Sequence, residues 1–410
     1  MLFMKKITIK RILTVISLLL YLNSSLIAQS NNKSISTDSL VKQRDIVDLF
    51  HITSKHISLT DSIKRNKGFG PFYSFMPAVG YTMLSGLTGT FVANMTFDTD
   101  TNRNRFSSIL LNSNYSQFNQ YWFIFNTNIF FEKYKLHLVG DDRYYKFPTH
   151  TYGFGLRNKP SDALNIDYSY LRIYQIIYRE ITPNFFVGLG YNLDYHWRIK
   201  TDSIPSKTFD QFWKNTNAKH SISSSPSFNM MFDSRKNPEN PQGGSYALLQ
   251  YRPNLMLLGS NNNWQSLLID LRHYIPFPAS TRNVLCLWNY EKLTLAGTAP
   301  YLDMPSIGWD EYSNTGRGYV PGRFTGRNLA YFETEYRMVL TNDGLLGCVV
   351  FANAETVFQN IDKLRGTYIP GGGFGLRVKV NKRSNTNIAV DYGFGIDGSH
   401  GFIFNLGEVF

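Results

Sequence analysis

Over residues 68–410, hydrophobic and polar side chains alternate along the chain with a period of two. In 385–395, for example, Ile388 and Val390 share one face and Asp391 belongs to the other. This period is the pattern of a β-strand. In a water-soluble sandwich the apolar face would cover a core, whereas in a membrane barrel it faces lipid and the charged face lines the lumen. The glycines and charges on the polar faces favour a barrel with a polar interior.

Seventeen stretches carry this alternation, although a bacterial single-chain barrel has an even number of strands. The stretches are 72–82, 86–97, 105–115, 119–131, 133–140, 149–158, 164–179, 184–198, 219–233, 244–252, 263–275, 282–296, 328–340, 345–357, 368–380, 385–395 and 400–410. Either 133–140 and 149–158 form one bent strand, or 72–82 is only a lead-in. We therefore predict an all-β fold, a transmembrane antiparallel β-barrel of 16 strands over residues 68–410.

Two connections between predicted strands are long, 201–219 and the Gly- and Pro-rich 299–327. Long loops of such barrels face the outside of the cell, and short turns face the periplasm. Within the predicted barrel, no stretch approaches eighteen consecutive apolar residues, so we predict no transmembrane helix there.

The first 28 residues are organised like a secretory signal peptide. Basic residues between Lys5 and Arg11 precede a short apolar run, 12–22, and small and polar residues follow as far as Ala28. We predict cleavage after Ala28. A membrane anchor is the alternative, although the run is short for a membrane span. Residues 29–67 are then a polar periplasmic lead segment with one helical patch, which is interpreted as a linker, a short helix or a plug.

Composition supports the barrel and excludes other classes. Aromatic residues make up 15% of the chain and charged residues 18%, which suits aromatic girdles and a lipid-facing band. The net charge is +12, but the basic residues are scattered rather than gathered on one stripe, so we predict no nucleic-acid binding. Cys286 and Cys348 are too few for a disulfide framework or a metal site. None of the 8 His residues has zinc-ligand spacing or lies in a nucleophile motif, so no enzyme, metal or cofactor is predicted.

Several stretches resemble the barrel domain of the BamA/TamA family, also called the bacterial surface-antigen domain. The first, 232–244, resembles the family's Asp-x-Arg, Asn-Pro, Pro-x-x-Gly turn between two central strands. Its motif residues are Asp233, Arg235, Asn237, Pro238, Pro241 and Gly243. Proline fixes φ and removes a donor, and glycine allows positive φ, so the segment is predicted to be a periplasmic turn. An ordinary tight turn is the alternative.

The second stretch, Gly316-Arg317-Gly318-Tyr319 followed by Gly322-Arg323-Phe324, resembles the Arg-Gly-aromatic tip of the family's sixth extracellular loop. In the family that loop folds back into the lumen, where its Arg meets an acidic residue of the wall. An Arg in a narrow, partly desolvated lumen needs a carboxylate partner. The candidate partners are Glu333, Glu335, Glu355 and Asp391. An exposed basic loop tip is the alternative.

The third stretch, 351–355, resembles a strand motif that reads Phe-x-Asp-x-Gly in the family. Here Asn353 stands at the Asp position and Glu355 at the Gly position, so the partner of Arg317 stays open, with Glu355, on the same face as Asn353, as one source of the missing charge. Two later stretches, 373–377 and 391–393, match the next two strands of the family.

The last predicted strand, 400–410, places four apolar residues on one face. They are Phe402, Phe404, Leu406 and Phe410. An aromatic residue at the end of an alternating strand resembles the export signal of outer-membrane barrels.

The resemblance implies assembly and insertion of outer-membrane proteins, or translocation through the barrel, by way of a weak seam between the first and last strands. Residues 29–67 are too few for one of the periplasmic POTRA domains that precede the barrel in the family. We therefore expect a barrel-only member that needs a separate periplasmic or lipoprotein partner and has unfolded outer-membrane proteins as clients. The alternative is a passive channel or a structural barrel. Either would be a monomer in the outer-membrane lipid of a Gram-negative bacterium.

Overall fold

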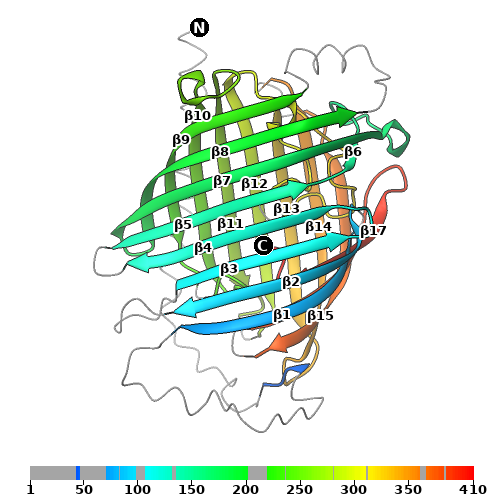
Figure 1. Cartoon of the computed structure of the whole chain (residues 1–410). Helices are drawn as coiled ribbons and strands as arrows, with labels where there is room; N and C mark the ends of the chain where they lie inside the picture. Colours follow the sequence, from blue (N-terminus) through cyan, green and yellow to red (C-terminus); the bar gives the residue numbers. More distant parts are fainter. Residues whose placement is uncertain are drawn as a thin grey trace. The chain divides into compact units, whose positions relative to one another are not determined.

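The computed structural model describes residues 43–46, 71–82, 84–97, 107–131, 135–201, 219–235, 237–279, 281–310, 313–360, 366–382 and 385–410. Most of them belong to antiparallel strands (Figure 1). The strands are β1 (Phe72–Thr82), β2 (Gly86–Phe97), β3 (Ser107–Ser116), β4 (Tyr121–Phe131), β5 (Leu136–Lys146), β6 (Thr149–Thr151), β7 (Leu164–Thr182), β8 (Phe185–Thr201), β9 (His220–Asp233), β10 (Gly244–Asn254), β11 (Trp264–Pro276), β12 (Val284–Gly297), β13 (Asn328–Val339), β14 (Leu346–Phe358), β15 (Ile369–Asn381), β16 (Thr386–Phe394) and β17 (His400–Leu406). The short 3-10 helices are η3 (Pro160–Asp162), η4 (Met256–Leu258) and η5 (Tyr301–Asp303).

Two predicted segments lie wholly or mostly outside the described residues: the signal peptide, 1–28, and the lead segment, 29–67, of which 43–46 is described. None of the helices in the described part of the chain is long and apolar enough to cross a membrane.

Neighbouring strands pair antiparallel around the sheet, and β17 returns to β1. β5 and β6 both pair with β7, so they are two parts of one strand. The interruption lies at Phe147-Pro148, where proline has no N–H to donate to the ladder. The sheet is therefore a nearly closed barrel of 16 strands, which confirms the predicted number. β1 pairs with β2 along its whole length and is not a lead-in.

The seam between β1 and β17 is the weakest junction of the barrel. Within the described residues, these two strands pair at one position, Thr82↔Ile403. On its other side, β17 pairs with β16 along its whole length. On the rest of β1, from Phe72 to Tyr81, the backbone N–H and C=O groups at the seam edge therefore have no hydrogen-bond partner on β17.

The period-two pattern places apolar side chains outside the barrel and polar side chains inside it. On β17, Phe402, Phe404 and Leu406 are 49%, 39% and 52% exposed. On β16, the side chains of Ala389 and Asp391 are buried. This distribution is the reverse of a water-soluble core and matches a sheet whose outer face lies in lipid.

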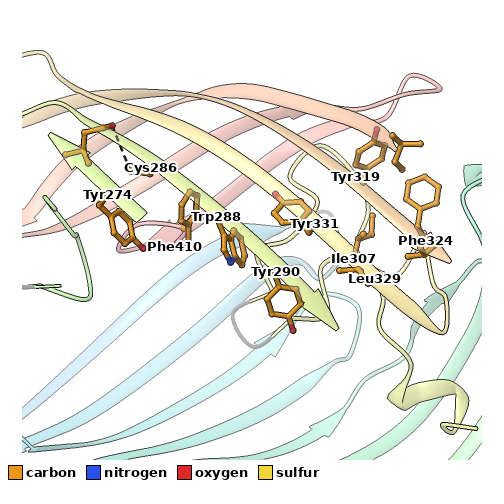
Figure 2. Close-up of a cluster of buried hydrophobic side chains, with 14 residues drawn as sticks. Tyr274, Cys286, Trp288, Tyr290, Ile307, Tyr319, Phe324, Leu329, Tyr331 and Phe410 are labelled. Carbon is orange, nitrogen blue, oxygen red and sulfur yellow. Dashed lines mark hydrogen bonds between the residues drawn. The ribbon is translucent and has the colours of Figure 1, made fainter. Parts of the chain in front are cut away.

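A packed aromatic cluster covers part of the inner wall (Figure 2). Trp288 on β12 lies at its centre, with ring centroids 5.0 Å from Phe410 and 5.2 Å from Tyr331. The indole Nε1–H of Trp288 donates to Asp270 at 2.9 Å. The interior is thus filled on this side by side chains in close contact.

The described part of the lead segment contacts two turns of the barrel. The N–H of Arg44 donates to the carbonyl of Asp343 at 3.1 Å, in the β13–β14 turn. The carboxylate of Asp45 accepts from the N–H of Lys382 at 3.2 Å, in the β15–β16 turn. Residues 43–46 therefore lie at the end of the barrel where these short turns are found.

We predict that Trp288→Ala lowers the free energy of unfolding by about 3–5 kcal/mol, because it removes a buried aromatic side chain and leaves a cavity. Urea unfolding of the protein in lipid vesicles measures this change. Leu257→Ala is the control, since Leu257 is 91% exposed in the short 3-10 helix η4 and its loss should change the free energy of unfolding by less than about 0.5 kcal/mol. Equal effects of the two substitutions would contradict the prediction.

Candidate functional site

The connection between β12 and β13, residues 298–327, is folded into the lumen, which confirms the prediction for this loop. Ile307, Tyr319 and Phe324 are buried and belong to the aromatic cluster of the inner wall (Figure 2). A loop in water would expose such side chains, whereas here they pack against β12 and β13. We call residues 298–327 the lumenal loop.

Asp310 shapes the tip of the lumenal loop. Its carboxylate accepts hydrogen bonds from the N–H of Asn314 at 2.9 Å and from the N–H and hydroxyl of Thr315 at 2.8 and 2.7 Å. The hydroxyl of Thr315 in turn accepts from the N–H of Gly308 at 2.9 Å. These bonds close the tip into a compact turn, so Arg317 leaves it at a fixed position.

The guanidinium of Arg317 meets three carboxylates of the barrel wall. Nη1 donates to Asp391 on β16 at 2.6 Å, and Nη2 donates to Glu335 on β13 at 2.5 Å and also to Glu333. The guanidinium also lies 3.6 Å from the ring centroid of Phe351. Burial alone would lower the pKa of Arg317, but the three carboxylates raise it well above its ordinary value. The cation is therefore fully desolvated and fully paired.

Two wall arginines hold these acids in place. Nε of Arg337 donates to Glu335 at 2.6 Å, and Nη1 of Arg377 donates to Asp391 at 2.5 Å. Arg377 also donates from Nε to Glu408 at 2.8 Å. The loop guanidinium therefore enters a network that already contains two wall cations, and Arg317 adds a third.

Gly318 and Tyr319 complete the predicted motif. Gly318 has a φ of +109°, and a Cβ there would lie 2.5 Å from the carbonyl oxygen of Phe394, so only glycine fits. The hydroxyl of Tyr319 donates to the carbonyl of Pro370 and accepts from the N–H of Ile396 at 3.1 Å. The tip thus contacts both β15 and the β16–β17 connection.

Glu355, one of the four candidate partners, does not contact the guanidinium of Arg317. Neither of its carboxyl oxygens has a hydrogen-bond partner within the described residues. It faces Gly316 instead, where a Cβ would lie 2.9 Å from Oε2. Asn353, at the position of the family's Asp, donates from Nδ2 to the carbonyl of Arg317 at 3.0 Å. An ionised Asp could not donate that bond, so this position now holds the loop backbone rather than the cation.

A second part of the lumenal loop is anchored to another section of the wall. The hydroxyl of Ser223 on β9 donates to Asp303 at 2.5 Å, and Nδ1 of His196 on β8 lies 3.6 Å from the same carboxyl group. The hydroxyl of Tyr301, in the same part of the loop, is hydrogen-bonded to the hydroxyl of Thr151 on β6. This anchor could not be predicted from the sequence, because nothing in the spacing of 301–303 marks it.

A cavity of about 90 Å³ lies beside Asp303. Its lining includes Tyr168, Arg172, Trp264 and Lys292. This volume admits a few water molecules. Among the described residues, no group of three or more His, Cys, Asp or Glu side chains is placed to hold a metal ion.

Arg323 forms a third anchor that the sequence analysis did not assign. Its Nη2 donates to Asp397 at 2.7 Å, in the β16–β17 connection, and its Nε donates to the carbonyl of Asn158 at 3.0 Å. Asn158 Nδ2 donates back to the carbonyl of Arg323 at 3.3 Å. The sequence places Arg323 in the stretch that resembles the family's loop, but its partners come from distant connections and could not be predicted.

The predicted turn motif is an ordered structure between β9 and β10. Nε and Nη2 of Arg235 donate to the two carboxylate oxygens of Asp233 at 2.9 and 2.8 Å. The guanidinium lies 4.4 Å from the ring centroid of Tyr246. Asn237 accepts from the N–H of Glu239 at 3.0 Å. The Asp-x-Arg pair thus fixes the entry to the turn.

The second half of the turn reaches another part of the sheet. Between Pro238 and Pro241, Asn240 is buried, and its Nδ2 donates to the carbonyl of Asn385 at 2.9 Å, in the β15–β16 turn. A Cβ added at Gly243 would lie 3.7 Å from Pro276, and the positive φ falls on the next residue, Gly244, at +101°. The turn therefore bridges strands that are far apart in the sheet.

Phe410 does not share the face of the other three residues of the predicted C-terminal signal. Phe402, Phe404 and Leu406 point outward from β17, but that strand ends at Leu406. Gly407 then adopts a φ of +95°, and Phe410 is buried against the inner wall. The expectation of one face was wrong, because alternation holds only while the backbone stays extended.

We predict that Arg317→Ala lowers stability by about 3–5 kcal/mol, because it leaves buried carboxylates without their cation. Heat-modifiable migration and protease resistance of the lumenal loop should both decrease, and the yield of folded barrel should fall. Arg157→Ala is the matched control, since Arg157 is exposed in another loop. Unchanged migration and unchanged protease resistance in Arg317→Ala would contradict the role of this side chain.

We predict that docking of the lumenal loop weakens between pH 5 and pH 8. Burial, with a further contribution from Asp194, raises the pKa of Asp303 from 3.8 to about 7. The folded state therefore binds the proton more tightly than the unfolded state, and the free energy of unfolding falls as pH rises from about 4 to 7. Protection of the lumenal loop from protease, compared at pH 5 and pH 8, measures this weakening. Asp303→Asn should remove the difference in protection between the two pH values. An unaltered pH dependence in that variant would show that another group is responsible.

Comparison of the chain with known proteins gives one family. A model described as the Omp85 superfamily domain matches residues 91–410. A search of curated proteins found no match.

Solved structures that share the fold include the following three. BamA from Haemophilus ducreyi lacking POTRA domains 1–3 is 16% identical, with a TM-score of 0.53, and the match covers 82% of this chain and 68% of that one. CdiB from Acinetobacter baumannii is 14% identical, with a TM-score of 0.53 and coverages of 82% and 60%. CdiB from Escherichia coli is 9% identical, with a TM-score of 0.54 and coverages of 82% and 62%.

The chain spans less than two thirds of the two CdiB chains, and at these identities the likeness concerns the fold alone. The family match covers most of the chain, including the lumenal loop, the acidic wall and the seam strand β17. The chain therefore belongs to the Omp85 superfamily of bacterial outer-membrane barrels.

Proposed function

We propose that this barrel inserts or translocates other polypeptides at the outer membrane, and that the seam between β1 and β17 is where they engage it. The observation that supports the proposal is that, over the residues that the structure describes, these strands pair at one position, Thr82↔Ile403. The family does not require catalysis for such a role, because its barrels are non-enzymatic assembly and transport proteins.

The physics of the bilayer makes a poorly paired seam a binding surface. In hydrocarbon no water satisfies free N–H and C=O groups, and each unsatisfied group costs several kcal/mol. The edge of β1 that precedes Thr82 is such a surface. An incoming extended segment would pair with its free N–H and C=O groups by adding a strand to the sheet. β17 is only 7 residues long and contains Gly401, so its backbone pairing with the edge of β1 is weak.

The filled interior counts against the alternative of an open passive channel. The lumenal loop is fastened by Arg317, by Arg323 and by Asp303, and the aromatic cluster packs against it. A solute would have to displace these contacts before it could pass through the barrel. A polypeptide that engages the seam would not have to cross the lumen.

The proposal includes partners. We propose that a periplasmic or lipoprotein accessory delivers unfolded outer-membrane proteins to this monomeric barrel. The contacts of Arg44 and Asp45 with the β13–β14 and β15–β16 turns support a role of this end of the barrel in docking such an accessory.

A disulfide across the seam tests the proposal. In a chain whose Cys286 and Cys348 are replaced by Ser, we introduce Thr82→Cys and Ile403→Cys, which are backbone partners. Cells depleted of the native protein and supplied with the locked variant should lose other β-barrels or surface lipoproteins from isolated outer membranes, measured by quantitative proteomics. A reducing agent should restore them.

The matched control is Tyr392→Cys with Phe402→Cys, which crosslinks β16 to β17 and leaves the seam free. Normal levels of all outer-membrane proteins in cells that contain only the seam-locked form would refute the proposal. The proteins lost on depletion would identify the clients.

A further inference from the structure

Residues 407–410, which we call the inturned segment, leave the seam strand and enter the barrel. The N–H of Gly407 donates to the carbonyl of Asn387 on β16 at 2.8 Å, and its φ of +95° turns the chain inward. Val409 and Phe410 are then buried, with the ring of Phe410 stacked on Trp288 at 5.0 Å (Figure 2). The end of β17 is therefore fixed by contacts inside the lumen.

Glu408 connects the inturned segment to the wall. Its carboxylate accepts from Nε of Arg377 at 2.8 Å and from Nδ2 of Asn387 at 2.6 Å. Its N–H donates to the carbonyl of Glu239, in the β9–β10 turn, at 3.3 Å. Burial acts to raise the pKa of Glu408, but Arg377 and Arg337 lower it overall, so the carboxylate stays charged and paired.

The lumenal loop holds the same segment through Asn314. The side-chain Nδ2 of Asn314 donates to the carbonyl of Val409 at 2.7 Å. Its Oδ1 accepts from Nδ2 of Asn405, on β17 itself, at 3.3 Å. One side chain of the loop is therefore hydrogen-bonded to the seam strand and to the segment that follows it.

The ion pairs give a second connection between the loop and the inturned segment. Arg337 donates to Glu335, a partner of Arg317, and also to the backbone oxygen of Phe410 at 2.8 Å. Arg377 likewise bridges Asp391, another partner of Arg317, and the carboxylate of Glu408. The loop cation and the inturned segment share their partners, so neither can move without disturbing the other's bonds.

We propose that the inturned segment is a tether through which the docked lumenal loop holds the seam strand in place, so that withdrawal of the loop releases β17. The strand is otherwise held by β16 on one edge and by a single pair with β1 on the other. By linkage, the coupling is reciprocal, and displacement of the segment should loosen the loop. This inference concerns the motion of the barrel itself and stands whether or not the barrel moves polypeptides.

Amide hydrogen exchange of the full-length protein in lipid nanodiscs tests the tether. Asn314→Ala should speed exchange in residues 400–406 by about 10-fold, because it removes two hydrogen bonds that fix β17. The matched control is Asn158→Ala, which also removes an amide clamp on the lumenal loop, at Arg323, but touches neither β17 nor the inturned segment. It should leave exchange in 400–406 unchanged.

A second variant tests the same coupling from the other side. Glu408→Gln keeps the shape of the side chain and removes the charge that Arg377 binds, so exchange in 400–406 should rise and protease protection of the lumenal loop should fall by several-fold. Unchanged exchange in 400–406 for both Asn314→Ala and Glu408→Gln would overturn the proposal. So would equal acceleration in Asn158→Ala, because the effect would then reflect general loosening of the loop.

Discussion

The absence of water in the hydrocarbon core of a membrane is the constraint on which this structure depends. Every backbone N–H and C=O at that depth must be paired within the protein, which requires a sheet that closes on itself. Closure places polar side chains inside, where they are shielded from lipid and partly from water. The inner wall can then keep Glu333, Glu335 and Asp391 together only by surrounding them with guanidinium groups. The charge network of the lumen is thus a consequence of closing the sheet.

The same constraint explains why the seam differs from the rest of the barrel. Elsewhere neighbouring strands pair over many residues, and exchange of partners would break many hydrogen bonds at once. At the seam the described residues of the two strands share one pair, Thr82↔Ile403, so contacts inside the barrel hold these edges more than their backbone pairing does. The lumenal loop and residues 407–410 take over a role that backbone pairing performs elsewhere.

Strands could be predicted from the sequence because the period of two is a local property that each stretch carries by itself. The strand number was also recoverable, since Pro148 marks the interruption between β5 and β6. Three of the four candidate acids contact Arg317, because they lie on the lumen-facing positions of strands that match the family. The fourth, Glu355, lies beside Gly316 instead. Which acid meets the guanidinium depends on how deeply the loop enters the lumen, and residue spacing in the sequence does not predict that depth. Contacts across the lumen, such as Ser223 with Asp303, join residues 80 positions apart and leave no local pattern.

The partners of Arg317 have a consequence for the order in which the chain assembles. All of its carboxylate partners come later in the sequence than the loop, on β13 and β16, and the segment that shares them follows β17. A chain that has not yet paired its final strands offers the guanidinium no complete site. A fully paired Arg317 therefore requires both β13 and β16 to be in place, so the docked loop is the sign of a barrel in which these two wall strands have already paired.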